Sequence, residues 1–327
     1  MEVKTLNNIR SSGVFMMLFV VAALVGLGVY SIRRASIENN LVKPLDEEPR
    51  ISLYIHETGE VKELSIEEYI KGVVAGEMKP DWPKDAYAAQ AILARTFTME
   101  KLSRGGTRAI HGTDMCDFVE HAQAYNPDAI TPTISQAVES TRGEVATWKN
   151  RYIKAWFHAY SGGRTESARV GLNFKEKEPP YIKIVKSPGE NYAPAEIESW
   201  IAEFTSDEIR NGLANSGINV GDIRDIKIAK KSTTGRASVI RVIHSQGSTN
   251  IPAAEFRLAI GANRLISTWL TSSPIVEDGR IIFKGTGYGH GVGMDQWGAY
   301  ALAKEGKGPE EIVEYFFKGI SIKKMWD

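Results

Sequence analysis

The stretch GTGYGHGVGMDQWGAY, residues 285–300, carries glycine at every second position from Gly285 to Gly293, with His290 among the glycines. The apolar run RIIFK precedes it, and a helical pattern begins at Asp295. A phosphate-binding loop has this order of strand, glycine loop and helix. The spacing excludes that function, because no register gives G-x-G-x-x-G and no G-K-[ST] follows.

Alternating glycines let a backbone approach a neighbour closely, and this allows two interpretations of the loop. It packs under another strand, or it lines a site for an elongated ligand. Polar and aromatic side chains at His290, Gln296 and Trp297 favour a polar cleft wall suited to a carbohydrate. We therefore expect His290 and Gln296 to contact substrate.

The composition is that of a globular protein and narrows the class of ligand. The chain has 327 residues, of which 43% are hydrophobic and 24% are charged. Its 40 basic residues balance 40 acidic ones, so we expect no nucleic-acid partner. The single cysteine, Cys116, excludes an intramolecular disulfide and a metal site built on several thiolates.

The amino-terminal region contains an uncharged, mostly apolar run at residues 13–32. At about 1.5 Å per residue, such a helix matches the hydrocarbon core of a bilayer, about 30 Å thick. We predict one membrane anchor rather than a cleaved signal peptide, since the run is long and no small-x-small site follows it directly. Basic residues flank both ends, so the charge pattern leaves the topology open.

The predicted order is a short tail at 1–12, the anchor at 13–32, a polar linker at 33–50 and one domain at 51–327. In that domain we expect a hairpin near residues 51–64 and helices over 65–78 and 83–102. Further strands are predicted at 144–148, 152–160, 181–185, 222–229 and 238–245, and helices at 194–204, 253–261 and 309–317. Because these elements follow no fixed βα spacing, the predicted class is α+β.

The predicted helix at 65–78 places an acid on its apolar face. Ser65 and Glu68 fit a capping box at its start. The positions that repeat at helical spacing are Ile66, Tyr69, Ile70, Val73, Val74 and then Glu77. A half-buried carboxyl group has a raised pKa and suits a general acid. The alternative is that Glu77 turns to solvent or pairs with Arg95 on the next helix.

Other polar clusters give weaker predictions. His111, Cys116 and His121 are possible zinc ligands, but a closed site needs a fourth, so we expect no bound metal. A serine nucleophile near His158 is not expected, because Gly-x-Ser-x-Gly is absent. By period-two alternation, Tyr181 and Lys183 share one face of a short strand; they either bind substrate or form a solvated face.

Five blocks of this sequence resemble the stage II sporulation protein D family, which includes amidase-enhancer proteins. In chain order they are YIKGVVAGEM, AAQAILARTF, FHAYSGGRTES, PPYIKIVKSPGE and GYGHGVGMDQWGAYALA. The resemblance covers essentially all of residues 51–327. It implies a lytic transglycosylase with an elongated cleft, which acts on peptidoglycan strands, preferably stripped of stem peptides.

The resemblance also implies a cellular location, partner proteins and site residues. The domain would lie outside the cell membrane, and in sporulating members it works with the amidase protein P and the membrane protein M during engulfment. The family's catalytic glutamate falls on Glu77. Its substrate-cleft residues fall on Arg95, Tyr181, Lys183, His158 and His290.

In one segment the chain departs from the family pattern. Some clostridial members bind zinc in the region of residues 111–122 with more than one cysteine, whereas here Ala122 stands beside His121. A single catalytic acid suffices for a lytic transglycosylase, so we expect Glu166 to be structural. The alternatives are a glycan-binding enhancer of a separate amidase and a membrane-anchored assembly protein.

Overall fold

The computed structural model of the chain describes residues 42–327. The predicted tail at 1–12 and the predicted anchor at 13–32 lie outside these residues. Within the described part, no helix is both long enough and apolar enough to cross a bilayer. Pro44–Asp327 form one compact unit.

The end of the predicted linker, 33–50, belongs to this folded unit. Leu45 donates its backbone N–H to the carbonyl of Met325 at 2.7 Å. Glu48 accepts the backbone N–H of Glu67 at 2.9 Å. The folded part therefore begins before residue 51, because contacts with distant segments order a stretch whose polar composition is typical of a linker.

The first elements of the unit are the predicted hairpin and two helices. Strand β1 (Arg50–Tyr54) pairs antiparallel with β2 (Val61–Ser65), and β3 (Met115–Cys116) pairs parallel with β1. Helix α2 (Ile66–Glu77) follows at once, with the Ser65 hydroxyl accepting the N–H of Glu68 at 3.4 Å. The hairpin and the helix confirm the predictions for this segment. Of the predicted capping box only the Ser65 half is formed, because the Glu68 carboxylate accepts from Lys71 Nζ at 2.5 Å instead of reaching back to Ser65.

Helix α3 (Lys84–Leu102) lies at the centre of the first hydrophobic core, where Ile92 and Leu93 are fully buried. Its alanines let other elements pack close. These are α2, α5 (Pro132–Ser140), β4 (Glu144–Trp148), α10 (Gln296–Lys304) and α11 (Pro309–Phe316). Strand β4 pairs with β5 (Arg151–Tyr152) and β14 (Ser321–Lys324), so the end of the chain closes this core.

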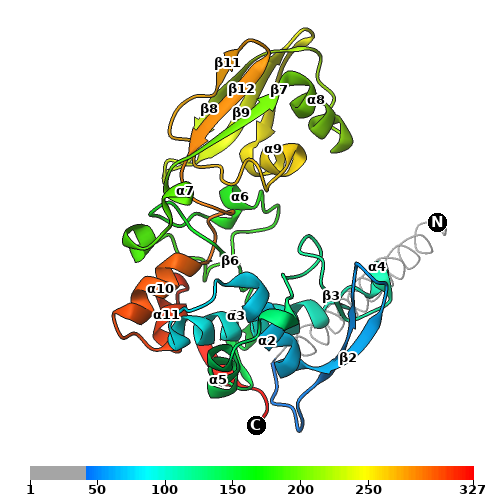
Figure 1. The fold of residues 1–327 in the computed structure, drawn as a ribbon, viewed down its shortest axis with the longest axis vertical. Coiled ribbons are helices and arrows are strands. Elements are labelled where there is room, and N and C mark those ends of the chain that lie inside the picture. Colours follow the sequence, from blue (N-terminus) through cyan, green and yellow to red (C-terminus); the bar gives the residue numbers. More distant parts are fainter. Residues whose placement is uncertain (1–41) are drawn as a thin grey trace, which may run out of the picture. The chain divides into compact units, whose positions relative to one another are not determined.

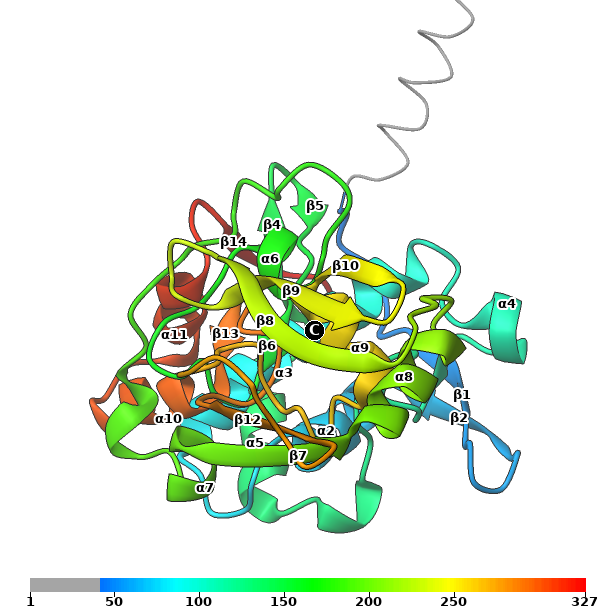
Figure 2. The ribbon, with the colours of Figure 1, turned by 90° about the horizontal axis from the view of Figure 1, so that it is seen from above.

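The second core is built from two sheets and two helices. One sheet has the order β10–β9–β8 and the other β11–β12–β7. The bounds are β7 Trp200–Thr205, β8 Ile223–Lys231, β9 Ala237–His244, β10 Gly247–Pro252, β11 Ile275–Glu277, β12 Arg280–Gly285, α8 Ser206–Asn215 and α9 Ala253–Ile260. Helix α8 packs against β7 and α9 against β9 (Figure 1). The antiparallel strands β8 and β9 run side by side (Figure 2).

Short elements complete the fold, which is α+β as predicted. Strands β6 (Phe157–His158) and β13 (Met294–Asp295) form a two-stranded parallel pair. The remaining helical turns are α4 Arg108–His111, α6 Ala168–Gly171, α7 Ala195–Glu198 and the 3₁₀ turns Pro127–Ala129 and Pro188–Asn191.

Three local predictions are wrong. Residues 194–204 form only the short helix α7 and then strand β7, in which Trp200, Ala202 and Phe204 are buried on one face while the intervening residues are exposed. Pairing with β12 outweighs the helical propensity of this stretch. Residues 181–185 form no strand, and of 152–160 only short pieces are strands.

The glycine loop between β12 and β13 connects the two cores. Gly291 and Gly293 have φ angles of 82° and 74°, a left-handed conformation that side chains disfavour. A Cβ atom at Gly291 would lie 2.7 Å from the Arg236 guanidinium, and one at Gly293 would lie 2.0 Å from the carbonyl oxygen of Trp156. The alternating glycines therefore allow close backbone approach, the first of the two interpretations.

Candidate active site

Glu77 is the last residue of α2, where the predicted apolar stripe ends. The stripe is confirmed, because every apolar member of it is completely buried: Ile66, Tyr69, Ile70, Val73 and Val74. The Glu77 side chain is half-buried, and its Oε1 accepts the backbone N–H of Ala124 at 2.7 Å. Burial raises the pKa of Glu77 to about 7, although the bond from Ala124 acts to lower it. This carboxyl group can hold a proton near neutral pH.

A cavity of about 640 Å³ brings four of the predicted site residues together. They are Glu77 from α2, His158 from β6, His290 from the glycine loop and Gln296 from the start of α10. The volume is in the range of small-ligand sites. The glycine loop thus lines this cavity as well as packing closely against its neighbours.

The two histidines of the cavity are neutral at physiological pH. Burial lowers the pKa of His158 to about 3 and holds that of His290 well below its usual value. The rings lie 5.5 Å apart. His158 Nδ1 lies 3.2 Å from the Val292 carbonyl oxygen, which can only accept, so Nδ1 carries the proton. His158 Nε2 is then a buried acceptor, and no group of residues 42–327 bonds to it.

Arg95 does not line this cavity, although it was predicted to bind substrate. It is completely buried and forms a bidentate ion pair with Glu67, with nitrogen to oxygen distances of 3.0 and 2.7 Å. A further bond joins it to the Glu144 carbonyl at 2.9 Å. Its guanidinium therefore fastens α3 to α2 and β4, and the alternative ion pair between Arg95 and Glu77 is not formed. The buried partner Glu67 was missed from the sequence.

Neither Tyr181 nor Lys183 lines the cavity, although both were predicted to bind substrate. The Tyr181 hydroxyl accepts the backbone N–H of Lys154 at 2.8 Å, and burial raises its pKa to about 12. Lys183 Nζ donates to the Tyr315 carbonyl at 3.1 Å. In this conformation both side chains stabilise the packing of the 181–186 segment.

Sequence reasoning missed two charged residues that line the cavity, Arg257 and Glu120. Arg257 comes from α9 in the second core, and Glu120 is an exposed residue of the loop after β3. No local pattern marks either one, because their place depends on how distant segments pack.

Glu166 is buried outside the cavity lining. Its Oε1 accepts the N–H and hydroxyl of Ser167 at 2.7 and 3.0 Å. Its Oε2 accepts the hydroxyls of Ser232, at 2.5 Å, and Thr234. A carboxylate with both oxygens occupied in this way supports the hypothesis that Glu166 is structural.

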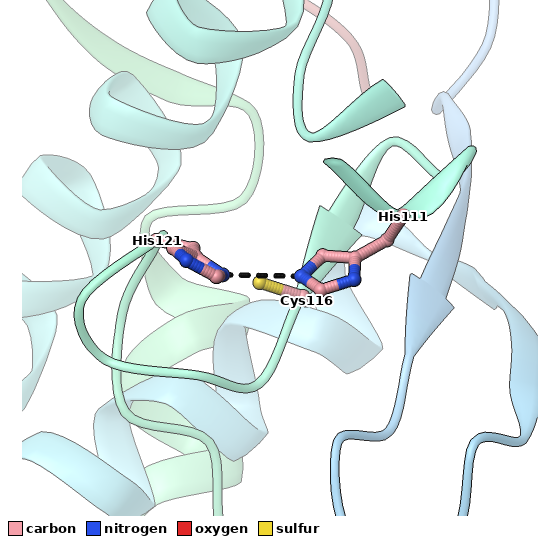
Figure 3. Close-up of side chains that lie close together, drawn as sticks. All are labelled: His111, Cys116 and His121. Atoms are coloured by element: carbon pink, nitrogen blue, oxygen red, sulfur yellow. Dashed lines mark hydrogen bonds between the residues drawn. The ribbon is translucent and has the colours of Figure 1, made fainter. Parts of the chain in front are cut away.

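His111, Cys116 and His121 converge near the loop that follows β3 (Figure 3). One potential ligand atom from each lies within 4.8 Å of the others, and His111 Nε2 is 3.1 Å from His121 Nδ1. Three converging donors fit a zinc ion with an open fourth position, since a closed structural site needs four. An ion held there would cross-link the turn of α4 to this loop, outside the cavity, because none of the three lines it.

Comparison with known proteins identifies the family. Residues 54–148 match the model described as Stage II sporulation protein. A Stage II sporulation protein D from Bacillus subtilis is 29% identical over 289 residues, which cover 84% of this chain and 79% of that one. The chain belongs to the stage II sporulation protein D family.

Further relatives agree with this assignment. An uncharacterized protein of Brachyspira hyodysenteriae is 34% identical over 80% of this chain and 67% of its own length. A B. subtilis protein named Amidase enhancer is 25% identical over 77% of this chain, which spans 40% of that relative. Residues 173–293 match a domain of unknown function. In this member of the stage II sporulation protein D family, the cavity draws on both matched regions, with Glu77 from one and Arg257 from the other.

Proposed function

We propose that this chain is a lytic transglycosylase that cleaves MurNAc–GlcNAc bonds of peptidoglycan, preferably in strands without stem peptides, during engulfment in sporulation. The observation that carries the proposal is the Glu77 carboxyl group, half-buried on the wall of a cavity and with a pKa of about 7. A protein that only binds glycan has no need of such an acid. The family assignment supports the sporulation role.

The proposed reaction uses one carboxyl group twice. Protonated Glu77 donates its proton to the glycosidic oxygen while the bond from that oxygen to C1 of the muramic acid breaks. The resulting carboxylate then takes the proton of the C6 hydroxyl, whose oxygen bonds to C1 and closes a 1,6-anhydro ring. The substrate supplies its own nucleophile, so the second carboxylate of ordinary glycosidases is not needed.

The neutral histidines fit an uncharged sugar. His158 Nε2 offers a buried acceptor for a sugar hydroxyl or acetamido N–H, and an unbonded buried acceptor is costly until a ligand reaches it. Gln296 is buried and adds an amide to the same wall. Metal is not required by this chemistry.

The cellular setting is part of the proposal. Residues 13–32 would anchor the chain in the cell membrane with the catalytic domain outside the cytoplasm. Its partners would be the amidase protein P, which removes stem peptides, and the membrane protein M. The substrate of this enzyme would then be the product of the amidase.

The test is to incubate the full-length chain with peptide-free glycan strands and to examine the products by mass spectrometry. We expect 1,6-anhydromuramic ends with the wild type and a loss of about 100-fold or more in rate with Glu77→Ala, the scale of a general acid. Circular dichroism checks that the variant is folded. Products with reducing ends would show hydrolysis and overturn the single-acid mechanism.

A second candidate function is a non-catalytic, glycan-binding enhancer of a cell-wall amidase. The relative named Amidase enhancer favours it. The same incubation separates the two functions: an enhancer binds the strands, releases no sugar, and accelerates a purified amidase added to intact peptidoglycan.

A further inference from the structure

Arg257 is a partly buried cation that lines the same cavity as Glu77. Its Nε and Nη2 donate to the carbonyls of Leu265 and Ala262, at 2.8 and 3.0 Å. These bonds hold the guanidinium against the loop after α9. They supply no negative charge.

The two completely buried arginines of the described residues have acidic neighbours. Arg95 is paired with Glu67, and the charges of Glu166 and Asp295 act on Arg236. Arg257 forms no ion pair with a carboxylate of residues 42–327, and burial lowers its pKa to about 10, so it remains charged at neutral pH. A charge that is partly removed from water is stabilised by a nearby opposite charge, so this unpaired guanidinium offers a site for an anion.

Arg257 is also the only lysine or arginine among the described residues that line the cavity. Both histidines there are neutral, and Glu77 is half-protonated near pH 7. Glu120 is exposed, so water screens its charge. The cavity therefore suits a ligand that is mostly uncharged and carries one anionic group.

The substrate of the proposed function has such a group. Muramic acid carries a lactyl ether on C3, in the same ring as the C1 atom that reacts. The lactyl carboxyl group is a free carboxylate when no peptide is attached and a neutral amide when a stem peptide is attached. A charge-assisted bond to a guanidinium is roughly twice as strong as a neutral one, so a cation in the cavity that holds Glu77 distinguishes the two forms.

A neighbouring hollow of about 390 Å³ extends the same surface and shares Phe97, Ala155 and Trp156 with the cavity. It carries Lys101, Arg104 and Lys154 together with one acid, Glu100. A peptide-free strand repeats its carboxylate on every second sugar. A second basic hollow next to the cavity suits such a repeating anion.

On the basis of the proposed function, we propose that Arg257 selects peptide-free glycan by binding the free lactyl carboxylate of the muramic acid held at Glu77. Arg257 is then a specificity-determining residue that contacts substrate. Its two carbonyl bonds orient it, and the remaining guanidinium nitrogen meets the carboxylate.

The test measures binding, so that it does not depend on cleavage. Calorimetry compares two GlcNAc–MurNAc tetrasaccharides, one with free lactyl carboxyls and one with the same carboxyls converted to methylamides. The protein is the full-length chain carrying Glu77→Gln, which removes the carboxyl group that titrates near neutral pH. We expect the acid form to bind about 10- to 100-fold more tightly than the amide form, the range of a hydrogen-bonded charge.

Adding Arg257→Met should reduce this ratio to near one, and Arg257→Lys should keep part of it. The matched control is Arg241→Met, an exposed arginine on β9 in the same core, which should leave the ratio unchanged. The ratio compares the affinities of one protein for the acid and the amide sugar. A variant that only loosens the loop after α9 would lower both affinities and leave their ratio unchanged.

Three results would overturn the proposal: equal binding of both sugars by the Glu77→Gln chain, no binding of the acid form, or a preference that survives Arg257→Met in a folded protein. The same experiments distinguish failure of the proposed transglycosylase activity from failure of the proposed role of Arg257. If the wild type cleaves neither sugar but the preference exists and depends on Arg257, the binding role stands and the transglycosylase does not.

Discussion

At the scale of single residues, Glu77 shows how a helix end controls the state of an acid. Helical periodicity directs it toward the interior, the chain stops being helical directly after it, and one backbone N–H is its bonding partner among the described residues. Its position at the carboxyl end of α2 also disfavours a negative charge. Local sequence was sufficient to place Glu77 at the end of the apolar stripe, because the stripe lies in its own helix, whereas the bond from Ala124 comes from a distant loop and was not predicted.

The raised pKa of Glu77 predicts the pH dependence of cleavage. Only the protonated acid can donate to the glycosidic oxygen, so activity should be present below the pKa and lost as the pH rises through about 7. The measurement is kcat/KM for peptide-free glycan across the pH range, with circular dichroism to confirm folding. A rate that stays constant well above pH 8 would contradict the assignment of Glu77 as the acid.

The same pKa predicts a gain in stability when the acid is removed. The folded pKa is about 7 and an unfolded glutamate has a pKa of about 4.3, so between these values the folded state binds more protons and stability falls as the pH rises. Glu77→Gln should therefore raise the free energy of unfolding by about 1–3 kcal/mol at pH 8 and change it little at pH 4. Urea unfolding at both pH values tests this, and an equal effect at both would refute it.

Glu120 is the other acid on the cavity wall and offers a test of the single-acid mechanism. Because it is exposed, we expect Glu120→Gln to retain cleavage and to give the same anhydro ends. Mass spectrometry of the products shows whether the Glu120 variant still cleaves the strands, with Glu77→Gln as the inactive reference. If the folded Glu120 variant lost cleavage, the reaction would need two carboxylates.

At the scale of elements, the glycine loop determines how the two cores are connected. Gly293 lies where a side chain would collide with the Trp156 carbonyl, whose oxygen also accepts the N–H of Met294 at 3.1 Å. This pairing carries the chain into β13 and then α10, and so places Gln296 on the cavity wall. Periodic glycines in the sequence indicated close approach but could not say what they approached.

Replacing Gly293 by alanine should cost about 2–4 kcal/mol, which combines left-handed backbone strain with overpacking. Gly279 is a matched control, because it has the same φ of 74° but nothing within 4 Å of an added Cβ. Gly279→Ala should therefore cost only the backbone strain, about 1–2 kcal/mol. Chemical denaturation of both variants measures the difference, and equal losses would show that contact with Trp156 is unimportant.

At the scale of the whole molecule, the local elements were largely predictable and the contacts between distant ones were not. The hairpin, α2, α3, α9 and α11 follow from periodicity and capping, whereas β7 was predicted as a helix because its partner β12 lies far along the chain. Arg95 illustrates the same limit for the site. Its position on α3 was predicted correctly, but only the packed structure shows that its guanidinium is paired with the Glu67 carboxylate.

The cluster of His111, Cys116 and His121 leads to a prediction about the whole molecule, because none of the three residues lines the cavity. Ala124, which donates to Glu77, follows the same loop, so an ion on the cluster could influence the acid only by ordering that loop. The proposed reaction needs a proton donor and no Lewis acid. We therefore expect dialysis against a strong chelator to leave the release of anhydro ends unchanged, with metal content followed by mass spectrometry. Loss of cleavage that zinc restores, and that Cys116→Ser reproduces, would instead show that a metal-ordered loop positions Glu77.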